Sequence, residues 1–224
     1  MKKLLIIAAT LAAFSSIKAQ DDMDISMEVG YQSKYVFRGI GLADESMTVS
    51  IDAAFEDAYL GMWTNQPITG NIDNEFDFYG GMGFDVAEGI SMDVGGTLYY
   101  YPESGPGTST FELYAGFAFD SELNPAIYVF YDLDLEAFTF EGSVGHSFEI
   151  DEKSSIDIAA FLGYVDGDGS DYAYHGASAD VNYSLGDSSN ASIGIRISDA
   201  SYDFYTEDGP TQEAYVGAAI STGW

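Results

Sequence analysis

Most of the chain after residue 22 alternates between apolar and polar positions with a period of two. At the start of this region Met23, Ile25, Met27, Val29 and Tyr31 are apolar, and the residues between them are polar or glycine. Successive side chains of a β-strand point to opposite faces, so this alternation predicts a strand with one apolar and one polar face. Similar segments follow to the last residue, and no stretch sustains a helical period.

About twelve strands are expected, most of them of roughly the nine to eleven residues that a tilted membrane strand needs. They cover Met23–Tyr31, Met47–Phe55, Ala58–Gln66, Phe76–Phe84, Ile90–Tyr100, Phe111–Phe119, Ala126–Tyr131, Phe138–Phe148, Ile156–Tyr164, Ala173–Leu185, Ile193–Ile197 and Ala214–Trp224. The segments Ala58–Gln66 and Ala126–Tyr131 are apolar at both parities, so the pattern leaves open which of their faces is outward.

The connections between the expected strands fall into two alternating sets. Tight turns are expected at Glu56-Asp57, Val86–Gly89, Asp120–Pro125, Asp151–Ser154 and Gly186–Asn190. Generally longer loops are expected at Gly39–Ser46, Pro67–Asn74, Pro102–Thr108, Asp166–Asp171 and Asp199–Thr211, with a short one at Asp132–Glu136. Short periplasmic turns that alternate with longer outer loops are typical of outer-membrane barrels. The pattern therefore predicts an all-β fold, a closed antiparallel transmembrane β-barrel with both termini on the periplasmic side.

A soluble sandwich also alternates, because it buries one face of each strand and solvates the other. Three features favour the barrel over this secreted soluble alternative. Aromatic residues on the apolar face gather near strand ends, as interface girdles do. Glycine and serine fall largely on the opposite parity, where a lumen would lie. The last residue, Trp224, shares the parity of Val216, Ala218 and Ile220, and such a terminal aromatic resembles the C-terminal signal of outer-membrane barrels.

The first residues have the pattern of a secretory signal. Lys2 and Lys3 precede an apolar stretch from Leu4 to Phe14, and small residues follow up to Ala19. This stretch is shorter than the roughly 20 apolar residues that a membrane-spanning helix needs. We therefore expect a signal peptide over residues 1–19, a single barrel domain over residues 20–224, and a location in the outer membrane.

Charge and composition limit the classes of partner and of fold that the chain can have. The chain has 7 Lys+Arg against 37 Asp+Glu, a formal net charge of -30, which argues against nucleic acid because that binding neutralises phosphates with basic side chains. The hydrophobic fraction of 46%, with 17 Tyr and 15 Phe, excludes a disordered acidic chain. Without cysteine, disulfides and thiolate metal sites are excluded as well.

If the apolar parity faces lipid, the other parity faces the lumen. This places the basic residues Lys34, Arg38 and Arg196 inside. The inward carboxylates are Asp24, Glu28, Asp52, Asp77, Asp93, Glu112, Glu141, Asp157 and Asp180. One interpretation is that the bases neutralise some of these acids and stiffen or plug the barrel, since an unpaired charge in a narrow lumen is costly. The other is that the excess of carboxylates makes an open lumen attract cations.

Enzymatic and metal-binding functions have weaker support. A hydrolytic barrel would need a histidine base beside its nucleophile, and both His146 and His175 fall on the lipid-facing parity. We expect no enzyme and no cofactor. The loop that contains Asp166, Asp168 and Asp171 resembles a calcium loop in its spacing but lacks the EF-hand glycine and glutamate. Divalent cations are expected there, and at the other acidic loops, only as loosely held counterions.

Three segments resemble a known family. Residues Ser33–Asp44, SKYVFRGIGLAD, are similar to the opening of the TorF-like porins, also called the Gcw_chp family, although Gly41-Leu42 stands where much of that family has Ser-Gln. Ala58–Pro67 and Asn74–Gly83 resemble the family's next strands. The resemblance covers the first third of the mature chain and implies a small outer-membrane barrel that acts as a porin.

Two functions remain open from the sequence. The first is a porin-like channel for small solutes in outer-membrane lipid, weakly preferring cations. The second is a non-conducting structural or adhesion barrel whose lumen is closed by the internal ion pairs and by Tyr79, Tyr99, Tyr101 and Tyr114.

Overall fold

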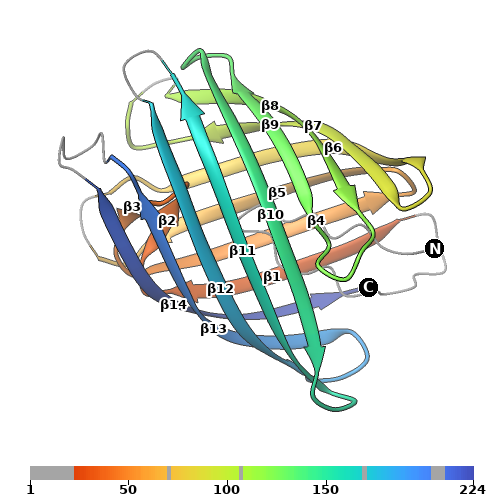
Figure 1. Cartoon of the computed structure of the whole chain (residues 1–224). Coiled ribbons are helices and arrows are strands. Elements are labelled where there is room, and N and C mark those ends of the chain that lie inside the picture. Colours follow the sequence, from red (N-terminus) through yellow and green to blue (C-terminus); the bar gives the residue numbers. More distant parts are fainter. Residues whose placement is uncertain (1–22, 70–71, 106–107, 168–170, 203–209) are drawn as a thin grey trace.

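Twelve antiparallel strands close into a barrel in the computed structural model, which describes residues 23–69, 72–105, 108–167, 171–202 and 210–224 (Figure 1). Each barrel strand pairs with the next barrel strand along the chain, and the first pairs with the last. The expected closed antiparallel barrel is confirmed. Closure leaves every strand with two hydrogen-bonded neighbours, so the sheet has no free edge.

The barrel strands are mostly longer than the alternation predicts. They are β1 (Asp24–Gln32), β4 (Ser46–Phe55), β5 (Ala58–Pro67), β6 (Glu75–Ala87), β7 (Ile90–Tyr100), β8 (Ser109–Phe119), β9 (Ala126–Asp132), β10 (Ala137–Glu149), β11 (Ser154–Asp166), β12 (Tyr172–Ser184), β13 (Ser189–Ala200) and β14 (Thr211–Gly223). The largest difference is in β13, expected only over Ile193–Ile197. Its flanking residues are small or polar, so they carry little contrast between the two faces, yet pairing with β12 and β14 extends the strand in both directions.

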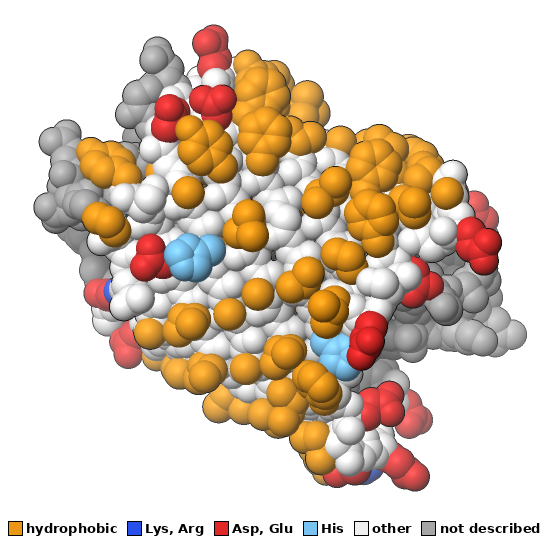
Figure 2. Space-filling model, viewed as in Figure 1, with side chains coloured by type: hydrophobic (Ala, Val, Ile, Leu, Met, Phe, Trp, Pro, Cys, Tyr) orange, Lys and Arg blue, Asp and Glu red, His pale blue; other side chains and the backbone are white. Residues whose placement is uncertain are grey.

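The outward face of the wall carries an apolar belt. Ile193, Ile195 and Ile197 of β13 are all more than half exposed, as is Leu162 of β11. Figure 2 shows hydrophobic side chains spread over this surface, with acidic side chains gathered towards its ends. Exposed apolar area of this extent fits a lipid solvent rather than water. The described residues include no helix long and apolar enough to cross a membrane.

The two segments of ambiguous parity have defined faces in the structure. In β5, Leu60 is 55% exposed on the outside, whereas Tyr59 and Trp63 contact residues of the interior. In β9, Ile127 is outward and Tyr128 points inward to Asp93. Both strands are apolar on two faces because several of their inward residues are aromatic.

The start of β1 and the C-terminus lie together at one end of the barrel. Ile25 and Trp224 exchange backbone hydrogen bonds of 3.0 and 2.9 Å. The tight turns lie at this same end, and in the β10–β11 turn the Asp151 carboxylate accepts a hydrogen bond from the backbone N–H of Lys153 at 2.8 Å. That backbone hydrogen bond is the main reason that the pKa of Asp151 lies below its usual value.

A second, two-stranded sheet lies inside the loop between β1 and β4. It consists of β2 (Tyr35–Phe37) and β3 (Ile40–Ala43), paired as an antiparallel hairpin. The sequence predicts a plain outer loop over most of this stretch, with Lys34 and Arg38 near the end of the first strand. Instead, β1 ends at Gln32 and the chain turns into the barrel, where Tyr35, Val36, Ile40 and Ala43 are buried.

Candidate functional site

The hairpin β2–β3 turns tightly at Arg38 and Gly39. Both residues have positive φ angles, 47° and 83°, as the two central positions of a type I′ hairpin turn require. Glycine is also needed at position 39 for space, because a Cβ there would lie 2.8 Å from Cβ of Tyr174 and 2.9 Å from the carbonyl oxygen of Asp199. The turn therefore presses its backbone against β12 and β13 and presents the Arg38 side chain to the lumen.

The base of the hairpin is tied to β14. The backbone N–H of Ser33 donates to the carbonyl of Val216 at 2.9 Å, and the N–H of Val216 donates to Oγ of Ser33 at 3.0 Å. Beside them, Nζ of Lys34 forms an ion pair of 2.6 Å with Glu213. These contacts fix the direction in which the hairpin leaves the wall.

The middle of the hairpin is seated in an apolar cluster on the β11–β13 side of the barrel. Ile40 is 1% exposed and packs with Val165, Tyr172, Tyr174 and Ala200. Burying one isoleucine side chain contributes about 1.5–3 kcal/mol, which makes this seat a main source of the hairpin's docking free energy.

The other side of the hairpin reaches the opposite part of the wall. Arg38 forms two hydrogen bonds of 2.9 Å with the two carboxylate oxygens of Glu112 in β8, and the Tyr99 hydroxyl in β7 donates to the same carboxylate at 3.0 Å. The Tyr35 ring lies 5.6 Å from that of Trp63 in β5. Because the hairpin contacts β5, β7 and β8 as well as β11 to β14, it crosses the lumen.

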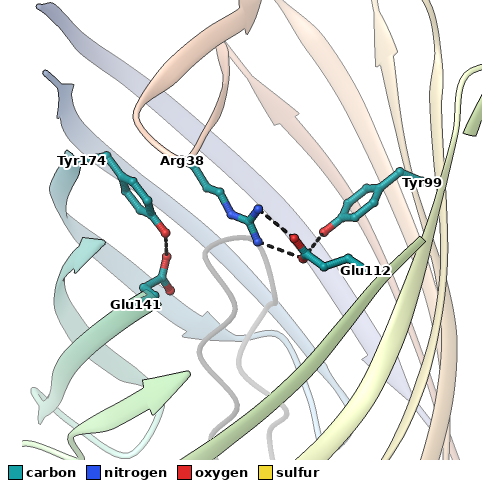
Figure 3. Close-up of polar contacts among 5 residues, drawn as sticks. All are labelled: Arg38, Tyr99, Glu112, Glu141 and Tyr174. Carbon is teal, nitrogen blue, oxygen red and sulfur yellow. Dashed lines mark hydrogen bonds and ion pairs between the residues drawn. The ribbon is translucent and has the colours of Figure 1, made fainter. Parts of the chain in front are cut away.

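Figure 3 shows Arg38 reaching from the hairpin to Glu112, which Tyr99 also contacts, and the pair Tyr174 and Glu141 on the other side of Arg38. The Tyr174 hydroxyl donates to Glu141 at 2.7 Å. The Arg38 and Glu112 side chains are 14% and 3% exposed, so the ion pair is largely removed from solvent. Its two-point geometry is the one that best offsets the desolvation of both charges.

Ring faces complete the surroundings of the guanidinium. The Cζ atom of Arg38 lies 4.8 Å from the ring centroid of Phe37 and 4.9 Å from that of Phe130 in β9, both within cation–π range. Phe37 and Tyr99 also meet edge to face at 6.0 Å. The guanidinium is therefore held by a carboxylate and two ring faces.

The structure places the eight candidate lumen residues on the inner parity of the wall or in the hairpin. Lys34 and Arg38 belong to the hairpin segment, and Glu112 and Glu141 lie on the wall beside it. The hairpin and these wall residues form the constriction of the lumen. Arg196 pairs with Asp180 at 2.6 Å, and Asp52 accepts a hydrogen bond from the Tyr79 hydroxyl. Asp77 is on the inner parity of β6, and its Oδ1 is a buried atom without a hydrogen-bond partner among the described residues.

Sequence reasoning names Tyr99 as a lumen residue but misses other aromatic and apolar members of the site. Tyr35 takes the lipid-facing parity when the alternation of the first strand is continued, Ile40 lies in the expected loop Gly39–Ser46, and Trp63 lies in a strand of ambiguous parity. The family-like segment around Arg38 was the one signal that marked this region, and it carried no information about folding into the lumen.

The histidine and metal candidates lie away from the lumen. His146 and His175 are on the outward parity, and Figure 2 shows histidine side chains on the outer surface. Nδ1 of His146 lies 2.7 Å from the carbonyl oxygen of Glu122. Asp171 accepts a hydrogen bond from the N–H of Gly167, Asp166 ends β11, and Asp168 lies outside the described residues. The described residues contain no cluster of three or more potential metal ligands.

Comparisons with known proteins agree with this architecture. The family model "Bacterial protein of unknown function (Gcw_chp)" matches residues 17–220. The KdgM porin superimposes with a TM-score of 0.60 at 12% identity, over 89% of this chain and 98% of its own. A structure of that porin in complex with disordered oligogalacturonate gives a TM-score of 0.58 at 11% identity, over 89% and 98%.

Two further solved structures have the same fold. The NanC porin gives a TM-score of 0.57 at 12% identity, over 88% of this chain and 98% of that one. An outer membrane channel from Pseudomonas putida F1 gives 0.55 at 9% identity, over 93% and 100%. No curated protein matches the sequence significantly. At these identities the structural similarities concern the barrel fold.

Proposed function

The chain belongs to the Gcw_chp family, and we propose that it is an outer-membrane pore for small solutes that weakly prefers cations. Its passage is narrowed by the hairpin β2–β3. The barrel fold that it shares with porins supports the channel, and the charge of the inner wall supports the preference for cations.

The imbalance of charge on the inner parity carries this proposal. The three inner bases Lys34, Arg38 and Arg196 are each paired with a carboxylate, so they add no net positive charge to the lumen. Carboxyl groups on the same parity such as Asp157 and Asp52 have no basic partner among the described ion pairs. A lumen lined in this way lowers the energy of a cation and raises that of an anion.

The ligand present in one KdgM porin structure gives a comparison for the proposed preference. That porin has been found with oligogalacturonate, an acidic sugar chain. A polyanion would meet carboxylates throughout the lumen of the present barrel and a constriction whose single guanidinium is already paired with Glu112. We therefore expect small cations and neutral solutes to pass in preference to acidic oligomers.

The test is the current through the refolded full-length barrel in a planar bilayer, with a KCl gradient across it. Discrete steps with a reversal potential of the sign set by K⁺ support the proposal. Asp157→Asn and Asp52→Asn should each move the reversal potential towards zero, because each removes a carboxylate of the inner parity that has no basic partner among the described ion pairs. Glu152→Gln, in the exposed β10–β11 turn, is the matched control and should leave it unchanged.

A silent bilayer from protein that still shows heat-modifiable gel mobility would overturn the proposal. That result would favour a structural barrel, which the hairpin across the lumen would then close permanently. Steps with an anion-selective reversal potential would keep the channel and overturn the role of the carboxylates.

A further inference from the structure

One part of the inner wall, from β5 to β9, is covered with tyrosine side chains. They are Tyr59, Tyr79, Tyr99, Tyr114 and Tyr128. Their hydroxyl groups are used within the wall. Tyr59 and Tyr128 donate to Asp93 at 2.9 and 3.2 Å, Tyr59 and Tyr114 hydrogen-bond to each other, and Tyr79 donates to Asp52.

Glycines on the neighbouring strands receive several of these rings. A Cβ at Gly61 would lie 2.5 Å from the Tyr79 ring, and a Cβ at Gly81 would lie 2.6 Å from the Tyr59 hydroxyl oxygen. Gly95 and Gly116 receive Tyr114 and Tyr128 in the same manner. Each of these rings therefore leans against the backbone of the wall instead of standing across the lumen, and it remains partly exposed on the inside.

The rings form a continuous patch that begins at the constriction. Phe130, whose face receives Arg38, lies 5.8 Å from Tyr128 and 6.1 Å from Tyr114 between ring centroids. The guanidinium of Arg38 thus shows how this wall holds a cation, with one carboxylate and the faces of adjacent rings. Around Asp93 the same combination recurs, a carboxylate among Tyr59, Tyr114 and Tyr128, with tyrosine hydroxyls in place of a guanidinium.

We propose that this tyrosine patch, Tyr59, Tyr114, Tyr128 and Phe130 around Asp93, is a binding site for small organic cations that carry an alkylammonium or guanidinium group. The inference rests on the proposed pore, because it names the class of solute that the lumen retains. An organic cation gains attraction from the ring quadrupoles and from the carboxylates, while its alkyl groups cover apolar ring surface. K⁺ holds its water more tightly and gains less from the rings.

Neutral sugars fit this patch less well. Recognition of a sugar needs hydrogen-bond donors and acceptors that are free to pair with its hydroxyl groups. Here the hydroxyls of Tyr59, Tyr114 and Tyr128 and the carboxylate of Asp93 are already paired with each other. The surface of the patch that remains free to contact a solute is therefore mainly the faces of the aromatic rings.

Tetramethylammonium chloride is the probe. Added at increasing concentration to a pore that carries K⁺ current, it should reduce the current with a measurable half-blocking concentration. Tyr128→Leu removes one ring and should raise that concentration about two- to fivefold, the range expected for one cation–π contact. Tyr128→Phe keeps the ring and should stay close to wild type. Tyr164→Leu removes an outward ring that is 44% exposed to lipid, and it is the matched control.

Three outcomes would overturn the inference. The half-blocking concentration is the same in Tyr128→Leu and wild type, or Tyr128→Phe loses as much as Tyr128→Leu, or glucose at equal concentration reduces the current as much as tetramethylammonium. Heat-modifiable mobility first establishes that each variant is folded. If wild type carries no current, the proposed pore fails on its own. Titration calorimetry of the detergent-folded barrel with tetramethylammonium then still tests the patch, with the same two Tyr128 variants.

Discussion

Glu112→Gln removes the anion that holds Arg38 across the lumen. Both guanidinium–carboxylate contacts are 2.9 Å, and the two side chains are largely buried. Removing one partner of a buried ion pair costs about 3–5 kcal/mol, because the remaining charge is left unpaired. Arg38 keeps the ring faces of Phe37 and Phe130, each of which contributes about 0.5–1 kcal/mol. We therefore expect the loss to lie near the lower end, at about 3 kcal/mol.

This loss should appear in the docking of the hairpin and not in the unfolding of the barrel. The hairpin β2–β3 is not one of the strands that close the barrel. When it detaches, the wall stays hydrogen-bonded and the ion pair is already lost before the barrel unfolds. A detached hairpin also widens the passage, so the single-channel conductance of Glu112→Gln should exceed that of wild type.

Tryptophan fluorescence can separate the two events. The chain has two tryptophans, and Trp63 lies 5.6 Å from the Tyr35 ring of the hairpin, whereas Trp224 is exposed at the far end. In a Trp224→Phe background, Trp63 emission during urea titration in lipid vesicles reports the hairpin. Heat-modifiable gel mobility reports the barrel. Glu112→Gln should lower the urea midpoint of the Trp63 signal and leave the barrel transition in place.

A double-mutant cycle tests whether the ion pair itself is responsible. Arg38→Met and Glu112→Leu each leave a buried charge unpaired, whereas the double variant leaves none. We expect the double variant to lose less than the sum of the single losses, with a coupling free energy of about 1–3 kcal/mol. Additive losses, or a Glu112→Gln variant with wild-type conductance and a wild-type Trp63 midpoint, would show that the pair does not hold the hairpin.

Three further perturbations follow from the packing and the charge of the lumen. Gly116→Ala should destabilise the barrel by about 1–3 kcal/mol in urea unfolding, because its Cβ would collide with the Tyr128 ring, whereas Gly142→Ala, with its nearest contact at 3.9 Å, should not destabilise it. Equal midpoints for these two variants would refute the ring-on-glycine packing. Ile40→Ala should weaken hairpin docking by about 2–5 kcal/mol and raise the single-channel conductance, and an unchanged conductance would show that the seat does not hold the hairpin. Lowering the pH from about 7 to about 3 should move the KCl reversal potential towards zero, since carboxylates of the lumen take up protons and lose their charge as the pH falls; a potential that does not move would exclude carboxylates as its source.

The strands could be predicted because every second residue of most strands is apolar and faces lipid. In β8 the outward residues Phe111, Leu113 and Phe117 alternate with the inward residues Glu112 and Gly116, and a one-residue error would turn every one of them to the wrong side. The pattern is weak where both parities carry apolar or small residues. For this reason the alternation does not define the outward face of β5, and it predicts a β13 that is too short.

The hairpin could not be predicted in the same way. Its position depends on contacts between residues that are far apart in the chain, 74 positions for Arg38 and Glu112 and 179 for Lys34 and Glu213. Barrel closure brings these partners together, and the local alternation of apolar and polar residues contains no information about such distant contacts. Continuing the alternation of β1 predicts that Arg38 faces the lumen from the wall, whereas the chain brings Arg38 into the lumen through a turn with two positive φ angles.

The same tyrosines suggest opposite functions when they are considered without the glycines beside them. As bulky inward residues, Tyr79 and Tyr114 would fill a barrel of this size and make it a plug. Gly61 and Gly95 on the adjacent strands accept these rings against the wall, so their bulk lies over the backbone and not on the axis. The obstruction is then concentrated in the hairpin, whose turn is held against the wall mainly by side-chain contacts. In such a barrel the strands fix the lining of the lumen. The contacts that hold the hairpin in the lumen can be removed one at a time by substitution without breaking the wall.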